Sequence, residues 1–347
     1  MMFSWCNVQT TDLGGMMRKI QTPGNGHYFN RRSRRTIILI ACALLLFVSL
    51  LSFENSSALG KTDGNEFVQQ TNTVDWKPVE QALGKSGSMQ PGDVYKVSLP
   101  RSDLKVTAAG VELKPTLALG SWVAFKRMGD MTVVMGDLVL TESEVTPVLS
   151  KLQQRGVETT ALHNHVLNES PRVMYMHIHA MGDAVTIAKA IHEALALTKT
   201  PFAASASTAT PEMGIDTKQI DEIMGQSGKV NGGVYQFSIA RADEITDMMG
   251  DHKMVIPPAM GLAQAINFQP TAAGKAAITG DFVLIAGEVN PVIKALRDNG
   301  IEVTALHSHM LTENPRLFFM HFWGNDDSLR LAHGLRAALD NVNVVRK

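Results

Sequence analysis

Histidines gather in two short stretches of this 347-residue sequence. Seven of the eleven histidines lie there: His163, His165, His177 and His179 in the first stretch, and His307, His309 and His321 in the second. Residues two apart on a β-strand point to the same face, so each His-x-His pair presents two imidazoles side by side. Neutral imidazole is a common ligand of divalent transition metals, which makes both stretches candidate metal sites.

A carboxylate accompanies the histidines in both stretches. The predicted metal ligands are therefore His163, His165, Glu169 and His177 in the first stretch, and His307, His309, Glu313 and His321 in the second. Such ligands favour zinc, copper, nickel, manganese or iron as a divalent cofactor. His179 is a weaker candidate because Trp323 takes its place in the second stretch.

The metal prediction depends on how the strands on either side of a turn pair. If His165 lies opposite His177, the imidazoles of one hairpin converge, whereas a shift of one residue sends them to opposite faces. The sequence does not decide between these registers. Two alternatives stay open: a polar pocket for a small anionic ligand, and a structural role in which backbone or carboxylate groups satisfy the histidines.

Two further pairs of residues are candidates for ligand binding. Arg172 and Arg316 each follow a proline and could hold a carboxylate or phosphate group through two hydrogen bonds. Asp137 and Asp281 each follow a glycine and could support a neighbouring ligand. The sequence contains no phosphate-binding glycine loop, no G-x-S-x-G and no H-E-x-x-H, so no catalytic residue is assigned.

These residues recur because the chain contains a duplication. Residues 136–183 align without a gap with residues 280–327, at an offset of 144. The expected organisation is an N-terminal region 1–58, a linker 59–74, a first repeat domain 75–197, a linker 198–214 and a second repeat domain 215–347. The period is too long for a solenoid and indicates two copies of a whole domain.

Periodicity predicts the elements that position the histidines. In the first repeat we expect a helix over 142–155, a strand over 157–167, a turn over 168–171, a strand over 172–180 and a helix from Asp183 to Ala196. The second repeat follows the same order. The predicted fold is α+β: two homologous domains, each an antiparallel or mixed sheet with helices on one face, like a split β-α-β unit.

Two resemblances rest on these motifs. The run from Ala161 to His177 and its second copy resemble the LppY/LpqO family of bacterial exported proteins, with Ala-Leu-His-Asn-His, Glu-x-Pro-Arg and Met-His in order. This resemblance implies a bacterial, extracytoplasmic protein with a duplicated domain, and no activity. His-x-His-x-x-x-Glu is also similar to the first motif of germin-type cupins, although cupins bring the next histidine from a distant strand.

The N-terminal region has the pattern of an export signal. An apolar run from Ile37 to Leu51 follows four arginines, and Ser56 to Ala58 are small enough for cleavage after Ala58. Lipidation at Cys42 and an uncleaved membrane anchor are the alternatives. We therefore expect the protein in the bacterial periplasm or at the cell surface.

Composition limits the partners. The chain beyond residue 58 carries 26 basic and 31 acidic side chains, which makes nucleic acid an unsuitable partner. The expected partners are a metal ion or a small ligand, and a membrane through the N-terminal segment if that segment is retained or lipidated. The first hypothesis is an exported binding protein. The alternatives are a metal-dependent hydrolase or cupin-like oxidoreductase, with Glu169 or Asp137 as general base, and a purely structural envelope module.

Overall fold

The computed structural model describes residues 74–203 and 213–346. The predicted export region 1–58 and most of both predicted linkers lie outside the described residues. Among the described helices, none has both the length and the apolar character needed to cross a membrane. Both repeats belong to the same compact unit.

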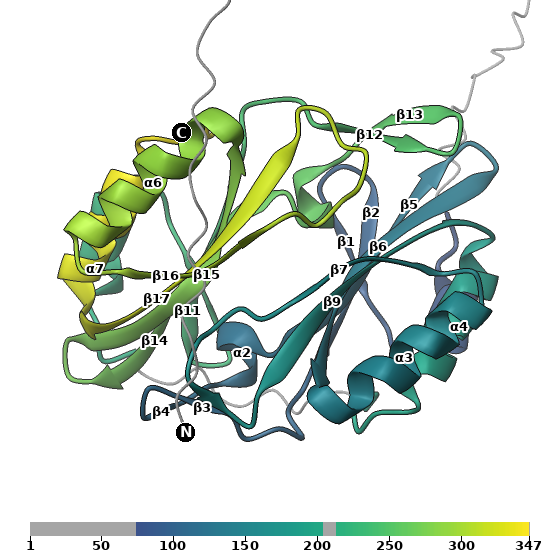
Figure 1. The fold of residues 1–347 in the computed structure, drawn as a ribbon, viewed down its shortest axis with the longest axis horizontal. Helices are drawn as coiled ribbons and strands as arrows, with labels where there is room; N and C mark the ends of the chain where they lie inside the picture. Colours follow the sequence, from purple (N-terminus) through teal and green to yellow (C-terminus); the bar gives the residue numbers. More distant parts are fainter. Residues whose placement is uncertain (1–73, 204–212, 347) are drawn as a thin grey trace, which may run out of the picture. The chain divides into compact units, whose positions relative to one another are not determined.

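The first repeat builds a six-stranded sheet with helices (Figure 1). Its elements are α1 (Lys77–Leu83), β1 (Ser88–Gln90), β2 (Val94–Pro100), β3 (Thr107–Ala108), β4 (Val111–Glu112), α2 (Pro115–Ala118), β5 (Gly120–Met128), β6 (Met131–Thr141), α3 (Glu142–Gln154), β7 (Glu158–His163), β8 (Glu169–Ser170), β9 (Val173–Gly182) and α4 (Ala184–Leu195). The strand order is β1-β2-β5-β6-β9-β7. Strands β3, β4 and β8 form a separate small sheet.

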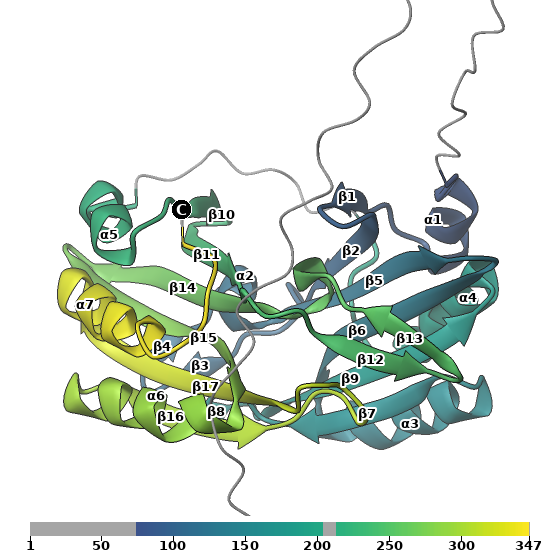
Figure 2. The ribbon, with the colours of Figure 1, turned by 90° about the horizontal axis from the view of Figure 1, so that it is seen from above.

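The second repeat builds an equivalent sheet in the order β10-β11-β14-β15-β17-β16. Its elements are α5 (Thr217–Met224), β10 (Lys229–Asn231), β11 (Val234–Ala240), β12 (Thr246–Met249), β13 (His252–Val255), η1 (Pro258–Met260), β14 (Ala263–Ala272), β15 (Lys275–Ile285), α6 (Ala286–Asp298), β16 (Glu302–His307), β17 (Leu317–Asp327) and α7 (Ser328–Leu339). The β12–β13 ribbon reaches over the first repeat (Figure 2), where Met254 packs in one cluster with Val133 and Met135.

The connection between the strands confirms the α+β fold predicted from the sequence. Strands β6 and β7 run parallel because both pair antiparallel with β9, which lies between them. Helix α3 joins β6 to β7, so the three elements form a split β-α-β unit. The second repeat has the same arrangement in β15, α6 and β16, with β17 between the strands. All neighbouring strands of the two large sheets are antiparallel.

Capping side chains set the starts of the helices that cover each sheet. Thr141 and Glu144 form a capping box at the start of α3. Asp183 accepts a hydrogen bond from Thr186 N at the start of α4, as the sequence predicted, and Asp327 caps α7 in the same way. Gly156 ends the α3 turn with φ of 75°, a conformation that favours glycine.

Alternate residues of each sheet face opposite ways, and both faces are covered. Val134, Leu138 and Leu140 of β6 pack in a cluster with residues of α3 and α4. The intervening residues Val133 and Val139 instead join clusters that contain residues of the second repeat. Figure 1 shows α3 and α4 together on one sheet and α6 and α7 together on the other. The repeats therefore meet through the sheet faces that their helices leave open.

Candidate metal centre

The strands bring the histidines of each repeat to the face that meets the other repeat. In the first repeat Asp137 on β6 lies opposite His177 on β9, and His163 at the end of β7 lies opposite Tyr175. A register shift between Thr159 and Ala161 keeps His163 and His177 on one face. The sequence left two registers open, and the structure has the one in which the imidazoles of the repeat converge.

The predicted hairpin differs from the observed one in its connection. The strand expected over 157–167 ends at His163, so His165 lies beyond the strand in a longer loop. That loop runs to β9 through the short strand β8, which pairs with β3. His165 consequently leaves the sheet and reaches across to the second repeat. His309 does the same from the second repeat.

Three pairs of imidazoles stack across the boundary between the repeats. The ring centroids of His163 and His307 are 3.5 Å apart, those of His165 and His321 are 3.7 Å apart, and those of His177 and His309 are 3.6 Å apart. The first pair joins equivalent residues, and the other two exchange under the 144-residue offset, so the arrangement has approximate two-fold symmetry. We expected one histidine cluster in each domain, and the structure instead forms a single centre between them.

Aromatic rings close the two ends of this stack. Tyr175 stacks on His165 with centroids 3.3 Å apart, and Phe319 stacks on His309 with centroids 3.4 Å apart. The relative exposure of four of the six imidazole residues is below a tenth: His163 9%, His177 6%, His309 9% and His321 1%. The centre is thus shielded from bulk water, which strengthens its electrostatic interactions.

Backbone carbonyls hold the Nδ1 atoms of three of these rings. His321 Nδ1 lies 2.9 Å from Gly280 O, His163 Nδ1 lies 3.2 Å from Asn164 O, and His307 Nδ1 lies 3.5 Å from Ser308 O. Because a carbonyl can only accept, each of these Nδ1 atoms donates its proton. The Nε2 atom of a neutral ring then keeps its lone pair, as in histidines that bind metals.

The Nε2 atoms themselves are buried without hydrogen-bond partners. This holds, among the described residues, for Nε2 of His163, His165, His177, His307, His309 and His321, and for Oδ1 of Asp137 and Asp281. Asp137 Oδ1 lies 3.8 Å from His177 Nε2, and Asp281 Oδ2 lies 3.9 Å from His309 Nε2. These separations are too long for hydrogen bonds. Buried polar atoms are normally paired, so this concentration is unusual.

Burial keeps the imidazoles in the form that binds metals. Desolvation lowers the pKa of His163 to about 4 and that of His307 to about 3. It also lowers the pKa of the other four rings well below the usual value. All six imidazoles are therefore neutral at pH 7. Desolvation raises the pKa of Asp137 to about 8, although the nearby Lys96 opposes that shift.

Two groups of histidines satisfy the distances expected of metal ligands. His163, His307, His309 and His321 form one group, and His163, His165 and His177 form the other. Within each group the ligand atoms all lie within 4.8 Å of one another. His163 belongs to both groups, so the two groups adjoin.

Glu169 and Glu313, predicted as metal ligands, belong to neither group among the described residues. Oε1 of Glu169 accepts a hydrogen bond of 3.1 Å from Val173 N, and Oε1 of Glu313 accepts one of 3.0 Å from Leu317 N. Each carboxylate therefore fixes the chain just before the strand that carries His177 or His321. The glutamates are close to the histidines in sequence, which is why they were predicted as ligands. In the structure a backbone N–H group binds one oxygen of each carboxylate within the loop.

The predicted anion-binding arginines also lie outside the histidine groups. Arg172 has a side chain 66% exposed and pairs with Glu142 at 3.7 Å. Arg316 donates to Met310 O, to Leu311 O and to Glu313. His179 Nδ1 lies 3.3 Å from Glu158. Asp137 and Asp281, in contrast, lie at the centre, as the two predicted ligand-binding residues that the structure brings to the histidines.

A small cavity borders one edge of the centre. His177 and His309 line it together with Trp122, Met260 and Met310. Lys96 lies close by, with its ammonium 3.9 Å from the centroid of the Trp122 ring and donating to Ala259 O. The second repeat has Gln236 in the place of Lys96, so the two halves of the centre differ in charge.

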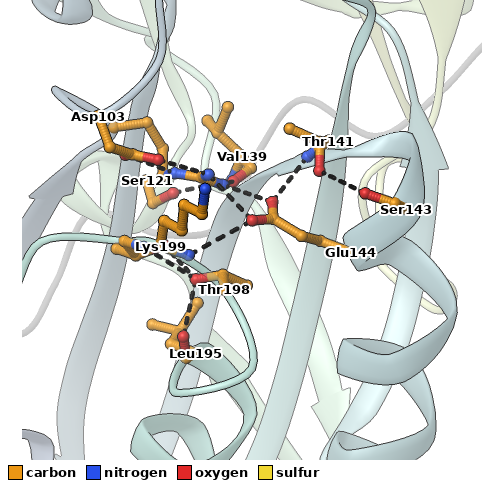
Figure 3. A network of polar contacts seen from close by, with 11 residues as sticks. Asp103, Ser121, Val139, Thr141, Ser143, Glu144, Leu195, Thr198 and Lys199 are labelled. Carbon is orange, nitrogen blue, oxygen red and sulfur yellow. Dashed lines mark hydrogen bonds and ion pairs between the residues drawn. The ribbon is translucent and has the colours of Figure 1, made fainter.

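Each repeat also contains a buried ion-pair network that was not predicted from the sequence. Arg101 is 0% exposed and donates to Val139 O at 2.7 Å and to both carboxylate oxygens of Glu144 at 2.8 and 3.1 Å. Figure 3 shows Asp103, Val139 and Glu144 gathered in this network. Arg241 binds Val283 O and Glu288 equivalently in the second repeat. The signal was present, since Arg-x-Asp occurs at both positions of the duplication.

The fold and the centre define a class of protein: a tandemly duplicated α+β protein with a buried cluster of histidines between its repeats. The family model of a domain of unknown function, DUF1259, matches residues 77–197 and again 218–341. The chain belongs to this family, and the two matches confirm the tandem repeat. No curated protein matches the chain.

Some solved structures are similar over much of their length. A trimeric bacterial microcompartment shell protein, PduB, is 14% identical, with 76% of this chain and 97% of that chain covered and a TM-score of 0.20. EtuB from Clostridium kluyveri is 11% identical, with 74% and 91% covered and a TM-score of 0.18. Scores this low carry no argument about fold or function.

Proposed function

We propose that this protein binds divalent transition-metal ions at the centre between its repeats. The observation that carries the proposal is the set of six buried Nε2 atoms and two buried Oδ1 atoms that have no hydrogen-bond partner among the described residues. They come from both repeats, and cross-repeat stacking of the rings brings them together. Metal binding supplies what all of them lack, because a cation accepts lone pairs from nitrogen and oxygen alike.

The energetic argument favours a metal over a purely structural role. A buried polar atom without a partner costs about 1–3 kcal/mol. Eight such atoms would cost roughly 8–24 kcal/mol, which is as large as the whole free energy of unfolding of a typical domain, about 5–15 kcal/mol. A small anionic ligand fits less well, because neutral imidazoles offer it lone pairs and the arginines that could bind it lie elsewhere.

The ligand chemistry narrows the choice of metal. Imidazole nitrogen with a few carboxylate oxygens suits zinc, copper, nickel and iron, and suits manganese less well. The described residues contain no cysteine, so the centre offers no thiolate. The export predicted from residues 1–58 would place this metal-binding protein outside the cytoplasm.

Metal analysis of the full-length chain tests the proposal. The chain is exposed in turn to Zn²⁺, Cu²⁺, Ni²⁺, Mn²⁺ and Fe²⁺, freed of loosely bound ions with a weak chelator, and analysed by plasma mass spectrometry. We expect at least one ion per chain and a large loss in His163→Ala/His307→Ala. The exposed histidines of His252→Ala/His333→Ala make a matched control that keeps its metal.

Two results would overturn the proposal. One is a wild-type chain that retains none of the five metals after the chelator step. The other is retention of the same amount of metal by wild type and by His163→Ala/His307→Ala. The wild-type measurement stands alone, so a variant that fails to fold does not weaken the test. The second expected sign is a rise in the unfolding temperature when metal is added. At a metal concentration a thousand times the Kd, binding should raise the free energy of unfolding by about 4 kcal/mol.

A further inference from the structure

We infer that the centre holds two metal ions, one bound mainly by His163, His165, His177 and Asp137, and the other by His307, His309, His321 and Asp281. This inference rests on the proposed function, since it concerns how many ions the same centre binds. It predicts a definite stoichiometry and a definite division of the ligands between the repeats.

The number of donors supports two ions. Eight buried donor atoms without partners lie at the centre. A single ion with six ligands would leave two of them unpaired, each at a cost of about 1–3 kcal/mol. Two ions with four ligands each use all eight, and four is the usual coordination number of protein-bound zinc.

The grouping of the donors supports the same division. Each repeat contributes one set of three histidines, and each set lies within one of the two groups of mutually close ligand atoms. The stacked pairs place rings from the two repeats 3.5–3.7 Å apart. Two ions bound to stacked partners would then lie at a separation like the roughly 3.5–4 Å of known two-metal sites.

The two aspartates supply the anionic ligand of each half. Asp137 Oδ1 is 3.8 Å from His177 Nε2, and Asp281 Oδ2 is 3.9 Å from His309 Nε2. Oδ1 of each carboxyl group is buried without a hydrogen-bond partner among the described residues. A cation at each site would bind the deprotonated carboxyl group and give its oxygen the partner that the protein does not supply.

Stoichiometry measured on the full-length chain tests the inference. Plasma mass spectrometry gives the ratio of Zn²⁺ to protein, and native mass spectrometry shows how many ions one chain carries. We expect two ions in wild type, one in His165→Ala/His177→Ala and one in His309→Ala/His321→Ala. Asp137→Asn and Asp281→Asn, which keep the shape of the side chains, should each weaken binding of one ion at least tenfold. His252→Ala/His333→Ala should keep two.

The outcomes separate this inference from the proposed function. One ion per wild-type chain overturns the two-ion centre and leaves metal binding intact. No ion in wild type overturns both. Two ions in wild type that survive in both histidine double variants would place the metal elsewhere and also overturn the inference. Because the wild-type ratio needs no variant, misfolding of a double variant cannot hide a negative result.

Discussion

Replacing Arg101 by methionine should destabilise the protein severely. The guanidinium is fully buried and makes contacts of 2.7–3.1 Å with Val139 O, Glu144 and Asp103. Removing one partner from a buried ion pair costs about 3–5 kcal/mol, because the other charge stays buried. Glu144 keeps its hydrogen bond from Thr141 N, so the lower part of this range is expected. At roughly 2–4 °C per kcal/mol, the unfolding temperature should fall by about 6–12 °C.

Urea unfolding and thermal scans of the metal-free chain measure this effect. Arg172→Met is the matched control, because Arg172 is 66% exposed and its ion pair with Glu142 is long, at 3.7 Å. The control should change the free energy of unfolding by less than about 0.5 kcal/mol. If Arg101→Met costs less than about 1 kcal/mol, or no more than Arg172→Met, the importance given to the buried network is refuted.

Three further predictions follow from named contacts. Burial raises the pKa of Glu144, but its hydrogen bonds from Arg101 and Thr141 bring the pKa below the usual value of 4.5. The stabilisation lost in Arg101→Met is thus present above pH 4.5 and shrinks below it, which urea unfolding across pH would show. Gly280→Ala would place a Cβ 1.9 Å from Ala265 O and should lower the free energy of unfolding by at least about 1–3 kcal/mol. Gly287→Ala has no neighbour within 4 Å and should be neutral or stabilising; equal effects would contradict this account. Glu169→Gln retains an oxygen that accepts from Val173 N, so the metal content should stay unchanged. A lower metal content in this variant would show that Glu169 is a metal ligand.

The repeats and the fold were predictable because they depend on local patterns. The period of two in the strands, the caps at Asp183 and Asp327 and the 144-residue offset are all visible in the sequence. The strand period and the caps are local signals, and the duplication is visible when the sequence is compared with itself. The even register that brings His163 and His177 together was one of two alternatives, and only the register shift near Thr159 decides it.

The joint centre was not predictable from the same signals. It depends on two sheets packing face to face, and nothing in a local period says which surface of one repeat meets the other. His165 illustrates the limit: it was expected on a strand, and it leaves the strand to stack on His321. The glutamates show a related limit, since spacing alone cannot tell a metal ligand from a carboxylate that fixes a loop. Metal binding by Glu169 and Glu313 stays a prediction. Export remains a prediction, to be measured on the native N-terminus by mass spectrometry.

The cross-repeat stacking has a consequence for the history of the chain. A single copy of the repeat would carry only half of each stacked pair, so it could complete the centre only by associating with an identical copy about a two-fold axis. Joining the copies in one polypeptide makes that association independent of concentration. It also frees each half to change alone, and Tyr175 against Phe319, or Lys96 against Gln236, are substitutions that a symmetric pair of identical subunits could never have acquired on one side only.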